Sequence, residues 1–374
     1  MDIRKVLPHE LQEAAALSDY VFRQPDQQSM GKIFPCLFSP GISHSYAAFT
    51  AEGKMVSFMG MVPEIIRIGE ARLYTFSLGS VCTHPDYRGQ NLASRLLVEC
   101  KQHAKRSGAS LVFISGSRSL YTRSECRHFG RVESAAINQA AAAAIRSQAG
   151  GGWTVRSMVP EDTFAVSSLL SAAHVGYEQG PSQLLALLGA GAIPDIYRLD
   201  LQALVGIKDG KIQAFAVGAV HGEDRSTAAS SDPSRAVEWA GDVQGCALQL
   251  AEMLGRFPAE QLIIPVPWQE TELLGILKVS GADLTTGTNS GTVWLASAPA
   301  LLSQCAPLLP GQTFRSNEES DHACYMTTTE GQEIKLDDAG LLSLLFDPES
   351  PDKPLLPEKF ATIPLPYLSN LHFV

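Results

Sequence analysis

The stretch from Leu78 to Phe129 has the clearest pattern of hydrophobic and polar positions in the chain. A strand-like apolar pattern over 76–83 is followed by a polar turn and loop, and then by apolar positions at helical spacing up to about Ser107. Those positions are Leu92, Ala93, Leu96, Leu97, Cys100 and Ala104. Gly108 stands where a left-handed residue ends a helix, and 109–115 contains an unbroken apolar run typical of a buried strand. The pattern therefore predicts a strand, a loop, a helix and a second strand.

A strand that leads through a small-residue loop into a helix favours phosphate binding. The first N–H groups of a helix have no partner within the helix, and the helix dipole adds positive potential there. Small residues let the backbone approach an anion, and Arg88 adds a positive charge beside the loop. The patterns Gly-x-Gly-x-x-Gly and Gly-x-x-x-x-Gly-Lys-Ser/Thr are absent from the sequence. Neither a Rossmann site nor a P-loop is therefore indicated.

The segment from Val81 to Leu97 resembles the central motif of the GNAT superfamily of N-acetyltransferases. That motif is Arg/Gln-x-x-Gly-x-Gly/Ala at a helix start, after a strand that ends in Val-x-x-x-Pro. Arg88, Leu92 and Ala93 match it, whereas Asn91 stands where the family usually has glycine. Asparagine is the non-glycine residue that best tolerates positive φ, so we expect the loop to keep its shape.

The resemblance implies acetyl-CoA as the cosubstrate and no metal. In this superfamily the strand before the loop splays from its neighbour and leaves backbone groups free for pantetheine. A backbone N–H at 81–83 would then stabilise the oxyanion that develops on the thioester. The residues expected to bind the cofactor are Val81, Cys82, Thr83, Arg88, Gly89, Gln90, Asn91, Leu92, Ala93, Ser94 and Ser117.

The chain as a whole predicts an α/β protein with mixed sheets. A helix over 9–23 and strands over 46–50, 54–63 and 64–75 give the order expected of a GNAT fold. The alanine-rich segment before the glycines at 150–152 suggests a boundary there. After it the plan repeats, with a hairpin over 203–220, a helix over 245–257 and a strand over 262–266, but 238–246 contains no cofactor loop.

Three domains follow from this pattern. They are an N-terminal GNAT acetyl-CoA-binding domain (1–150), a second GNAT-like domain that lacks the cofactor loop (151–290), and a small C-terminal domain (291–374). The last has a strand at 292–295, a helix near 298–305, a strand at 324–328, a helix over 337–346 and a proline-rich tail. This order resembles the enhanced-intracellular-survival group of acetyltransferases, whose C-terminal domain is sterol-carrier-like.

Resemblance to that group also implies catalytic positions. Its general acid is the last tyrosine of a segment like Ile-Tyr-x-Arg-Phe-Gly-Tyr, where this chain has Cys126, while Tyr121 matches the earlier tyrosine. Tyr121, Cys126 and the absence of any dedicated acid are three alternatives, because a thiolate leaves readily. The terminal carboxylate is the base in that group, which here is the carboxylate of Val374. The alternative is a tail that docks for stability alone.

Other candidate residues have simpler interpretations. His84 is predicted to be a local hydrogen-bonding residue in a turn, and Cys82 a small buried residue. His103 is expected on the exposed side of its helix. Glu238, Trp239 and Asp242 could suit a cation-binding pocket, but a packed strand end with solvated acids is favoured.

Composition narrows the partners and the compartment. A net charge of −10 over 374 residues argues against nucleic acid and against an anionic membrane surface. Seven scattered cysteines without a Cys-x-x-Cys pair indicate a reducing compartment and no zinc site. With no signal-like or membrane-spanning run, a soluble, cytoplasmic protein is predicted.

The predicted function is an acetyl-CoA-dependent N-acetyltransferase that transfers acetyl to a primary amine by direct attack on the thioester. The expected partner is a small-molecule or peptide amine, and a homo-oligomer is compatible with the sequence. The alternative is a non-catalytic acyl-CoA-binding or sensing protein, which Asn91 and the missing tyrosine favour.

Overall fold

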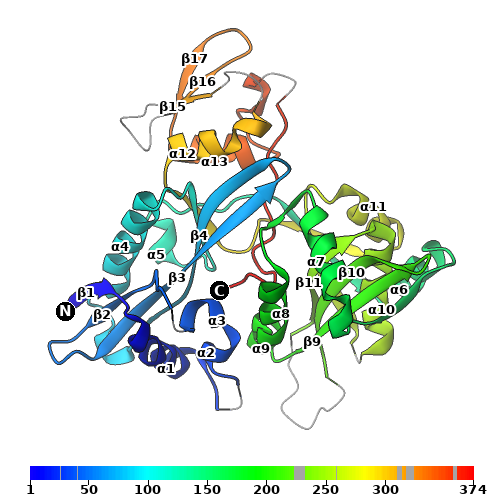
Figure 1. Cartoon of the computed structure of the whole chain (residues 1–374). Coiled ribbons are helices and arrows are strands. Elements are labelled where there is room, and N and C mark those ends of the chain that lie inside the picture. The colour runs from blue at the N-terminus through cyan, green and yellow to red at the C-terminus, as the bar shows by residue number, and fades with distance from the viewer. Residues whose placement is uncertain are drawn as a thin grey trace. The chain divides into compact units, whose positions relative to one another are not determined.

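The computed structural model describes residues 1–25, 27–39, 41–222, 232–257, 259–309, 314–316, 324–356 and 360–374. The chain divides into two compact units, whose elements are labelled in Figure 1. Unit 1 consists of residues 1–130, 290–365 and Val374. Unit 2 consists of residues 131–289 and 366–373. Among the described residues, no helix is long and apolar enough to cross a membrane.

The main sheet of unit 1 has the strand order β1-β2-β3-β4-β5-β14. Its strands are β1 (Asp2–Lys5), β2 (Tyr46–Phe49), β3 (Met55–Ile68), β4 (Ala71–Thr83), β5 (Leu111–Ile114) and β14 (Thr292–Leu295). Neighbours are antiparallel except β4 and β5, which are parallel. A parallel pair needs a crossover connection, and helix α4 (Leu92–Arg106) supplies it. The predicted strand–loop–helix–strand order is confirmed.

Helices cover this sheet with the apolar faces that the sequence pattern predicted. The buried side of α4 includes Leu96, Leu97 and Cys100, which pack with residues of β3, β4 and β5. Gly108, at φ +74°, adopts the left-handed conformation expected just beyond the end of α4. Helices α1 (Leu11–Phe22), α2 (Met30–Ile33) and α3 (Pro35–Phe38) lie between β1 and β2 in the chain, and α1 and α3 pack against β3.

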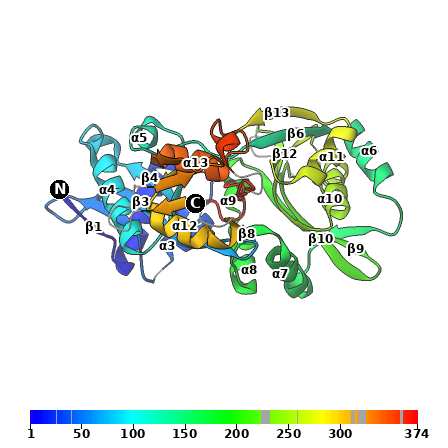
Figure 2. The same ribbon diagram turned by 90° about the horizontal axis from the view of Figure 1, so that it is seen from above.

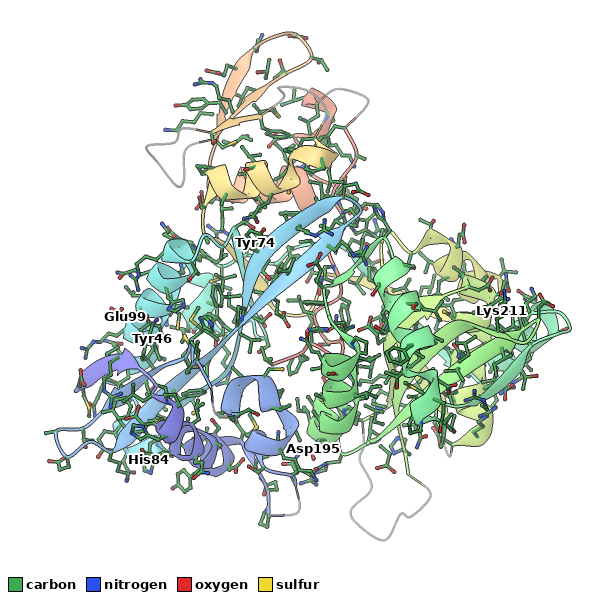
Figure 3. All side chains as sticks on the ribbon, in the orientation of Figure 1. Tyr46, Tyr74, His84, Glu99, Asp195 and Lys211 are labelled. Carbon is green, nitrogen blue, oxygen red and sulfur yellow. The ribbon has the colours of Figure 1, made fainter. Side chains whose placement is uncertain are left out.

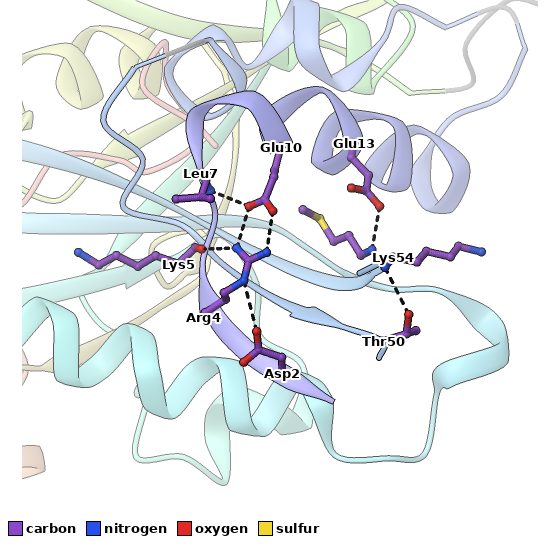
Figure 4. Close-up of polar contacts among 9 residues, drawn as sticks. Asp2, Arg4, Lys5, Leu7, Glu10, Glu13, Thr50 and Lys54 are labelled. Carbon is purple, nitrogen blue, oxygen red and sulfur yellow. Dashed lines mark hydrogen bonds and ion pairs between the residues drawn. The ribbon is translucent and has the colours of Figure 1, made fainter. Parts of the chain in front are cut away.

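A charged pair fixes the entry of α1. The Arg4 nitrogens Nη1 and Nη2 donate to the Glu10 carboxylate, at 2.9 and 2.7 Å, and the same carboxylate accepts from the Leu7 N–H (Figure 4). One turn further, the Glu13 carboxylate accepts from the Met55 N–H at 2.8 Å, which ties α1 to β3. Two parallel N–H···O bonds hold both side chains in one geometry.

The hairpin before the central strand differs from the prediction. The predicted break between strands at 63 and 64 is wrong, because β3 continues through Pro63, which is paired with Phe76. The chain turns instead between the paired residues Ile68 and Ala71, where Gly69 adopts a φ of +52°. A two-residue loop with positive φ is the preferred connection of a twisted hairpin.

Unit 2 repeats the strand plan of unit 1, in the order β7-β9-β10-β11-β12-β6-β13. Three antiparallel pairings lead to the parallel pair β11–β12, after which β6 and β13 add antiparallel strands. The strands are β7 (Thr154–Ser157), β9 (Asp200–Lys208), β10 (Lys211–Val220), β11 (Ser234–Gly241), β12 (Gln261–Pro267), β6 (Val132–Asn138) and β13 (Asp283–Gly287). The short strand β8 (Val175–Tyr177) follows the first helix after β7.

Helices lie on both faces of the unit 2 sheet, as Figure 2 shows. Residues of α6 (Gln139–Gln148), α10 (Val243–Arg256) and α11 (Thr271–Val279) share one buried cluster. Residues of α7 (Thr163–Ala172), α8 (Pro181–Ala190) and α9 (Ala192–Ile196) share the other. Because α10 crosses over between β11 and β12, it corresponds to α4 of unit 1.

The first boundary between the compact units does not fall at the predicted glycines. The first segment of unit 1 ends at Gly130, because β6 pairs with β12 over all of its residues and α6 packs on α10. The small side chains of Ala142 and Ala141 are buried in that cluster, which explains the alanine-rich composition. The glycines at 150–152 form the connection from α6 to β7 within unit 2.

The C-terminal elements largely follow the prediction. Helices α12 (Ala298–Cys305) and α13 (Asp338–Phe346) and strand β16 (Cys324–Thr327) lie where they were expected. A small sheet joins β16 to β15 (Phe314–Ser316) and β17 (Glu333–Leu336). The strand at 292–295, however, is β14 of the unit 1 sheet, where it pairs with β5. The division into three domains, with a sterol-carrier-like third, stays a prediction.

His103 is buried, so its predicted exposure is wrong. Its side of α4 faces a polar cluster: His103 Nε2 lies 3.0 Å from His44 Nδ1, and His103 Nδ1 lies 3.3 Å from the Tyr46 hydroxyl. Tyr46 lies beside α4 in Figure 3, close to Glu99. The Phe76 ring packs edge-on against the same imidazole. A histidine whose ring nitrogens both have partners can be buried, even on a side of the helix that the sequence pattern predicts to be polar and exposed.

The buried histidine pair predicts a loss of stability in acid. Burial lowers the pKa of His103 to about 4 and lowers that of His44. The pKa of His103 in the folded protein lies below the unfolded value of about 6.5. Neutral His103 therefore contributes its full share of stability above pH 6.5, and this stability is lost as the pH falls towards 4. As the pH falls through this range, the free energy of unfolding measured in urea should decrease for both proteins. The decrease should be smaller for His103→Gln than for the parent, by on the order of 1–2 kcal/mol after allowance for solvent screening. The exposed His128→Gln is the control, and equal slopes for His103→Gln and the parent would contradict the assignment.

Candidate functional site

The centre of unit 1 is the place where β4 and β5 separate. Their parallel register runs from Thr75 and Leu111 to Leu78 and Ile114, and the Ser115 N–H then donates to the Leu78 carbonyl at 3.1 Å. Strand β5 ends there, while β4 continues to Thr83. Tyr74 and His84, labelled in Figure 3, lie toward opposite ends of β4. The residues of β4 after Leu78 therefore have no ladder partner on β5.

A β-bulge in β4 coincides with this separation. Between the pairs Gly60↔Gly79 and Phe58↔Cys82, β4 has two intervening residues and β3 has one. Ser80, one of the two, has a φ of +50°, and its buried hydroxyl has no hydrogen-bond partner among the described residues. Bulges and strained backbone occur preferentially beside functional sites. Gly79 and Ser80 were not among the predicted site residues, although a glycine inside an apolar strand is a signal for a bulge.

The C-terminal carboxyl group lies against this bulge. A Cβ atom placed on Gly79 would stand 2.1 Å from the carboxyl carbon of Val374 and 2.3 Å from its oxygen. Only glycine leaves room for such an approach. Val374 itself is 7% exposed. The terminus marked C in Figure 1 is thus part of unit 1 and lies on its central strand.

The loop before α4 is open and exposed. Gly89 (φ +80°) and Asn91 (φ +56°) are both left-handed, so the positive φ expected at Asn91 is confirmed. A Cβ on Gly89 would meet no atom within 4 Å. Arg88, Gly89, Gln90, Asn91 and Ser94 are exposed, Ala93 is half-buried, and Leu92 is buried, so that only its backbone faces the loop. His84 accepts from the Asp86 N–H at 3.3 Å and is the predicted turn residue.

The first turn of α4 has no side-chain cap. Asn91 makes no capping hydrogen bond, and the first intrahelical bond runs from the Arg95 N–H to the Asn91 carbonyl. The preceding N–H groups of the helix are therefore available to an anion. In α10, by contrast, the Asp242 carboxylate accepts from the Gly245 N–H at 2.9 Å. The two repeats thus differ at the position where a phosphate would bind.

The remaining predicted cofactor residues lie along β4 and beyond β5. Cys82 is buried, its Sγ lies 3.6 Å from the Ser18 hydroxyl, and burial raises its pKa to about 11. This agrees with its interpretation as a small buried residue. Thr83 forms a hydroxyl pair with Ser57 at 2.7 Å, while Val81 is half-buried. Ser117 is exposed just beyond β5.

Both candidate acids are buried beside α4. Tyr121, in α5 (Ser119–Thr122), contacts Gly116, where an added Cβ would lie 3.2 Å from its ring. Burial raises the pKa of Tyr121 to about 12 and that of Cys126 to about 11. The thiol of Cys126 donates to the Ser124 carbonyl at 3.6 Å. Both groups are therefore protonated at neutral pH, but neither gives up its proton easily.

Solvated side chains were expected for Glu238 in β11 and for Asp242 just after it, but only Asp242 is exposed. Asp242 is exposed and caps α10, but Glu238 is half-buried, and burial raises its pKa to about 7. The Glu238 carboxylate accepts a hydrogen bond from the Leu371 N–H. Trp239 packs at the edge of the α6–α10–α11 cluster. The prediction is therefore wrong for Glu238, because the tail covers it.

Comparison with known proteins identifies the class. Residues 2–129 match the family model described as an acetyltransferase (GNAT) domain. No curated protein sequence matches the chain. The chain therefore carries a GNAT acetyltransferase domain, and the protein is an acyltransferase.

Solved structures share the fold over nearly the whole chain. A GCN5-related N-acetyltransferase from Kribbella flavida has a TM-score of 0.63 at 14% identity, over 97% of this chain and 99% of that chain. One from Anabaena variabilis has 0.64 at 13% identity, over 93% and 91%. Eis1 from Mycobacterium abscessus has 0.59 at 10% identity, over 90% and 85%. The predicted resemblance to the GNAT superfamily and the predicted α/β fold class are confirmed.

Proposed function

We propose that this acyltransferase moves an acetyl group from acetyl-CoA to a primary amine of a small molecule or peptide. The observation that carries the proposal is the terminal carboxyl of Val374 against the bulge of β4, where that strand leaves β5. The uncapped start of α4 supports it, since uncapped N–H groups close to the end of the same strand would attract an anion. GNAT domains use acyl-CoA, and the similar structures from Kribbella flavida and Anabaena variabilis are named as N-acetyltransferases.

Acetyl-CoA would extend from the loop before α4 along strand β4. The free N–H groups of the first turn of α4, together with Arg88, would hold the pyrophosphate. Pantetheine would follow β4 beyond Leu78, where the strand has no partner on β5. A backbone N–H at 81–83 would then stabilise the oxyanion that forms as the amine attacks the thioester carbonyl.

The carboxylate of Val374 would act as the base. In solution a C-terminal carboxylate has a pKa of about 3.5, and partial burial raises it while a nearby ammonium keeps it charged. The bound ammonium first loses one proton to water. The nitrogen of the resulting neutral amine attacks the carbonyl carbon, the carbon–sulfur bond breaks, and the thiolate leaves with the bonding electrons. The proton lost by the amine passes to the carboxylate, so charge balances without a metal or redox partner.

The raised pKa values favour a reaction without a dedicated acid. Proton transfer from a group at about 12 or 11 to a thiolate of pKa about 8.5 is unfavourable by roughly 3–5 kcal/mol. A thiolate leaves readily without that help. The high pKa values of Tyr121 and Cys126 also agree with the second candidate function, that of a non-catalytic acyl-CoA-binding protein. Release of free thiol from acetyl-CoA with a panel of primary amines separates the two functions, since a binding protein would release none.

The cofactor loop can be tested by adding one charge at the start of each corresponding helix. Ala93→Asp places a carboxylate at the second position of α4, where it should repel the pyrophosphate and weaken CoA binding at least tenfold. Gln244→Asp places the same charge at the second position of α10 and should leave CoA binding unchanged. Calorimetric titration with CoA gives both affinities. If Ala93→Asp binds CoA as tightly as the parent, the site lies elsewhere.

Two substitutions test the acid. Tyr121→Phe and Cys126→Ala should each retain turnover within about threefold of the parent, because no dedicated acid is used. Loss of a true general acid would cost about 10²-fold or more in kcat with CoA affinity retained. Such a loss in either variant would assign that residue as the acid.

The base can be tested by moving the carboxylate. Two glycines added after Val374 keep every side chain but displace the charge, and should lower kcat about 10²-fold or more without changing CoA affinity. Gly79→Ala should have the same effect, because its Cβ would occupy the place of the carboxyl carbon. Gly275→Ala on α11, where a Cβ meets nothing within 4 Å, is the matched control. Parent-like rates in both the extended chain and Gly79→Ala would show that the tail is structural.

A further inference from the structure

Strand β11 of unit 2 carries a bulge at the position of the bulge in β4. Between the pairs Gly218↔Ala236 and Val217↔Glu238, β11 has one extra residue, Val237. In β4 the extra residue follows the pair Gly60↔Gly79 in the same way. Counted from these pairs, Ala236 corresponds to Gly79 and Glu238 to Val81.

The strands of unit 2 also separate beside their bulge. Parallel pairing of β11 with β12 is limited to Ser234↔Leu262 and Arg235↔Ile263, directly before the bulge. Beyond it, β11 runs to Gly241. Unit 2 therefore retains the bulged, separating strand pair along which unit 1 would hold pantetheine. The helix start that would hold pyrophosphate is closed, because the Asp242 carboxylate takes the Gly245 N–H.

The chain's own C-terminal segment lies at this bulge. The Leu371 N–H donates to the carboxylate of Glu238, the residue that follows Val237. Leu371 is 6% exposed and belongs to the buried cluster that contains Val237 and Ala240 of β11. The segment turns at Leu371 and His372, where the Phe373 N–H donates to the Asn370 carbonyl at 3.1 Å. The turn thus has one N–H bonded beside the bulge and one apolar side chain packed on the strand.

Further contacts of unit 2 fix the register of the segment. The Asn289 side chain donates to the Pro366 carbonyl at 2.8 Å and accepts from the Leu368 N–H at 3.0 Å. Asn289 is only 5% exposed, so both bonds are made away from water. The His372 ring stacks on Tyr177 with centroids 4.0 Å apart, and its Nε2 lies 3.2 Å from the side-chain amide oxygen Oε1 of Gln179. Because one side-chain amide both donates to and accepts from the same segment, that segment can bind in only one register.

We propose that the bulged, separating strands of unit 2 form a binding site for the chain's own segment 366–373, in place of a cofactor. Asn289 and Glu238 are its positioning residues. Since Val374 follows this segment directly, they set the place of the terminal carboxylate. The catalytic consequence rests on the proposed function, whereas the binding of the tail does not.

The test uses the full chain with Asn289→Ala and Glu238→Ala, and with Asn138→Ala as the matched control. Asn138 caps α6 through the Ala140 and Ala141 N–H groups, so its loss costs a comparable pair of bonds in unit 2 but none to the tail. Trimming by a broad-specificity carboxypeptidase is followed by intact mass. Release of Val374 and Phe373 should be about tenfold faster in both tail variants than in the parent and in Asn138→Ala.

Turnover distinguishes this inference from the proposed function. In the tail variants kcat should fall about tenfold while the KM for acetyl-CoA stays unchanged. Faster trimming with a parent-like kcat would support the tail site and refute the role of the carboxylate as base. Trimming no faster than in Asn138→Ala would overturn the tail site. If Asn289→Ala melts far below the control, Glu238→Ala decides, because its half-buried side chain is removed at lower cost to folding.

Discussion

The parallel pairing of β4 with β5 stops after Leu78 and Ile114, and β4 then bulges at Ser80. Everything proposed for unit 1 depends on this interruption. Backbone groups that a continued ladder would use are left for a ligand, and the missing side chain of Gly79 leaves room for a carboxyl group. A buried backbone that forgoes ladder bonds is costly unless another partner supplies them. The interruption is therefore better understood as a binding feature than as a flaw in the sheet.

Local chemistry made much of this site predictable. The helical spacing from Leu92, the tolerance of asparagine for positive φ at Asn91 and the cap at Gly108 each depend on a few neighbouring residues, and each agrees with the structure. His103 and Glu238 were misjudged because their burial depends on distant partners, namely His44 and Tyr46 for one and Leu371 for the other. The first segment of unit 1 ends at Gly130 rather than near 150 for a similar reason: the pairing of β6 with β12 joins segments far apart in sequence. Sequence patterns report periodicity well but do not report such long-range pairings.

The two repeats show how one fold plan can be put to different uses by small changes at a strand end. Both have a bulge beside a short parallel pairing, and both lead into a crossover helix. Asn91 leaves its helix start open, whereas Asp242 closes the other with a carboxylate that would also repel a phosphate. Under the proposed function, that difference in capping would favour an anionic cofactor at α4 over α10.

A base supplied by the chain terminus also has a distinct physical advantage. A side-chain carboxylate brings rotatable bonds that must be frozen, whereas the terminal carboxylate is placed by the backbone alone. Prolines at 364 and 366 already restrict the approach, which lowers the entropy lost on ordering the tail. Burial of Leu371 and Val374, at roughly 1.5–3 kcal/mol each, then offsets much of the backbone cost of about 1–2 kcal/mol per residue.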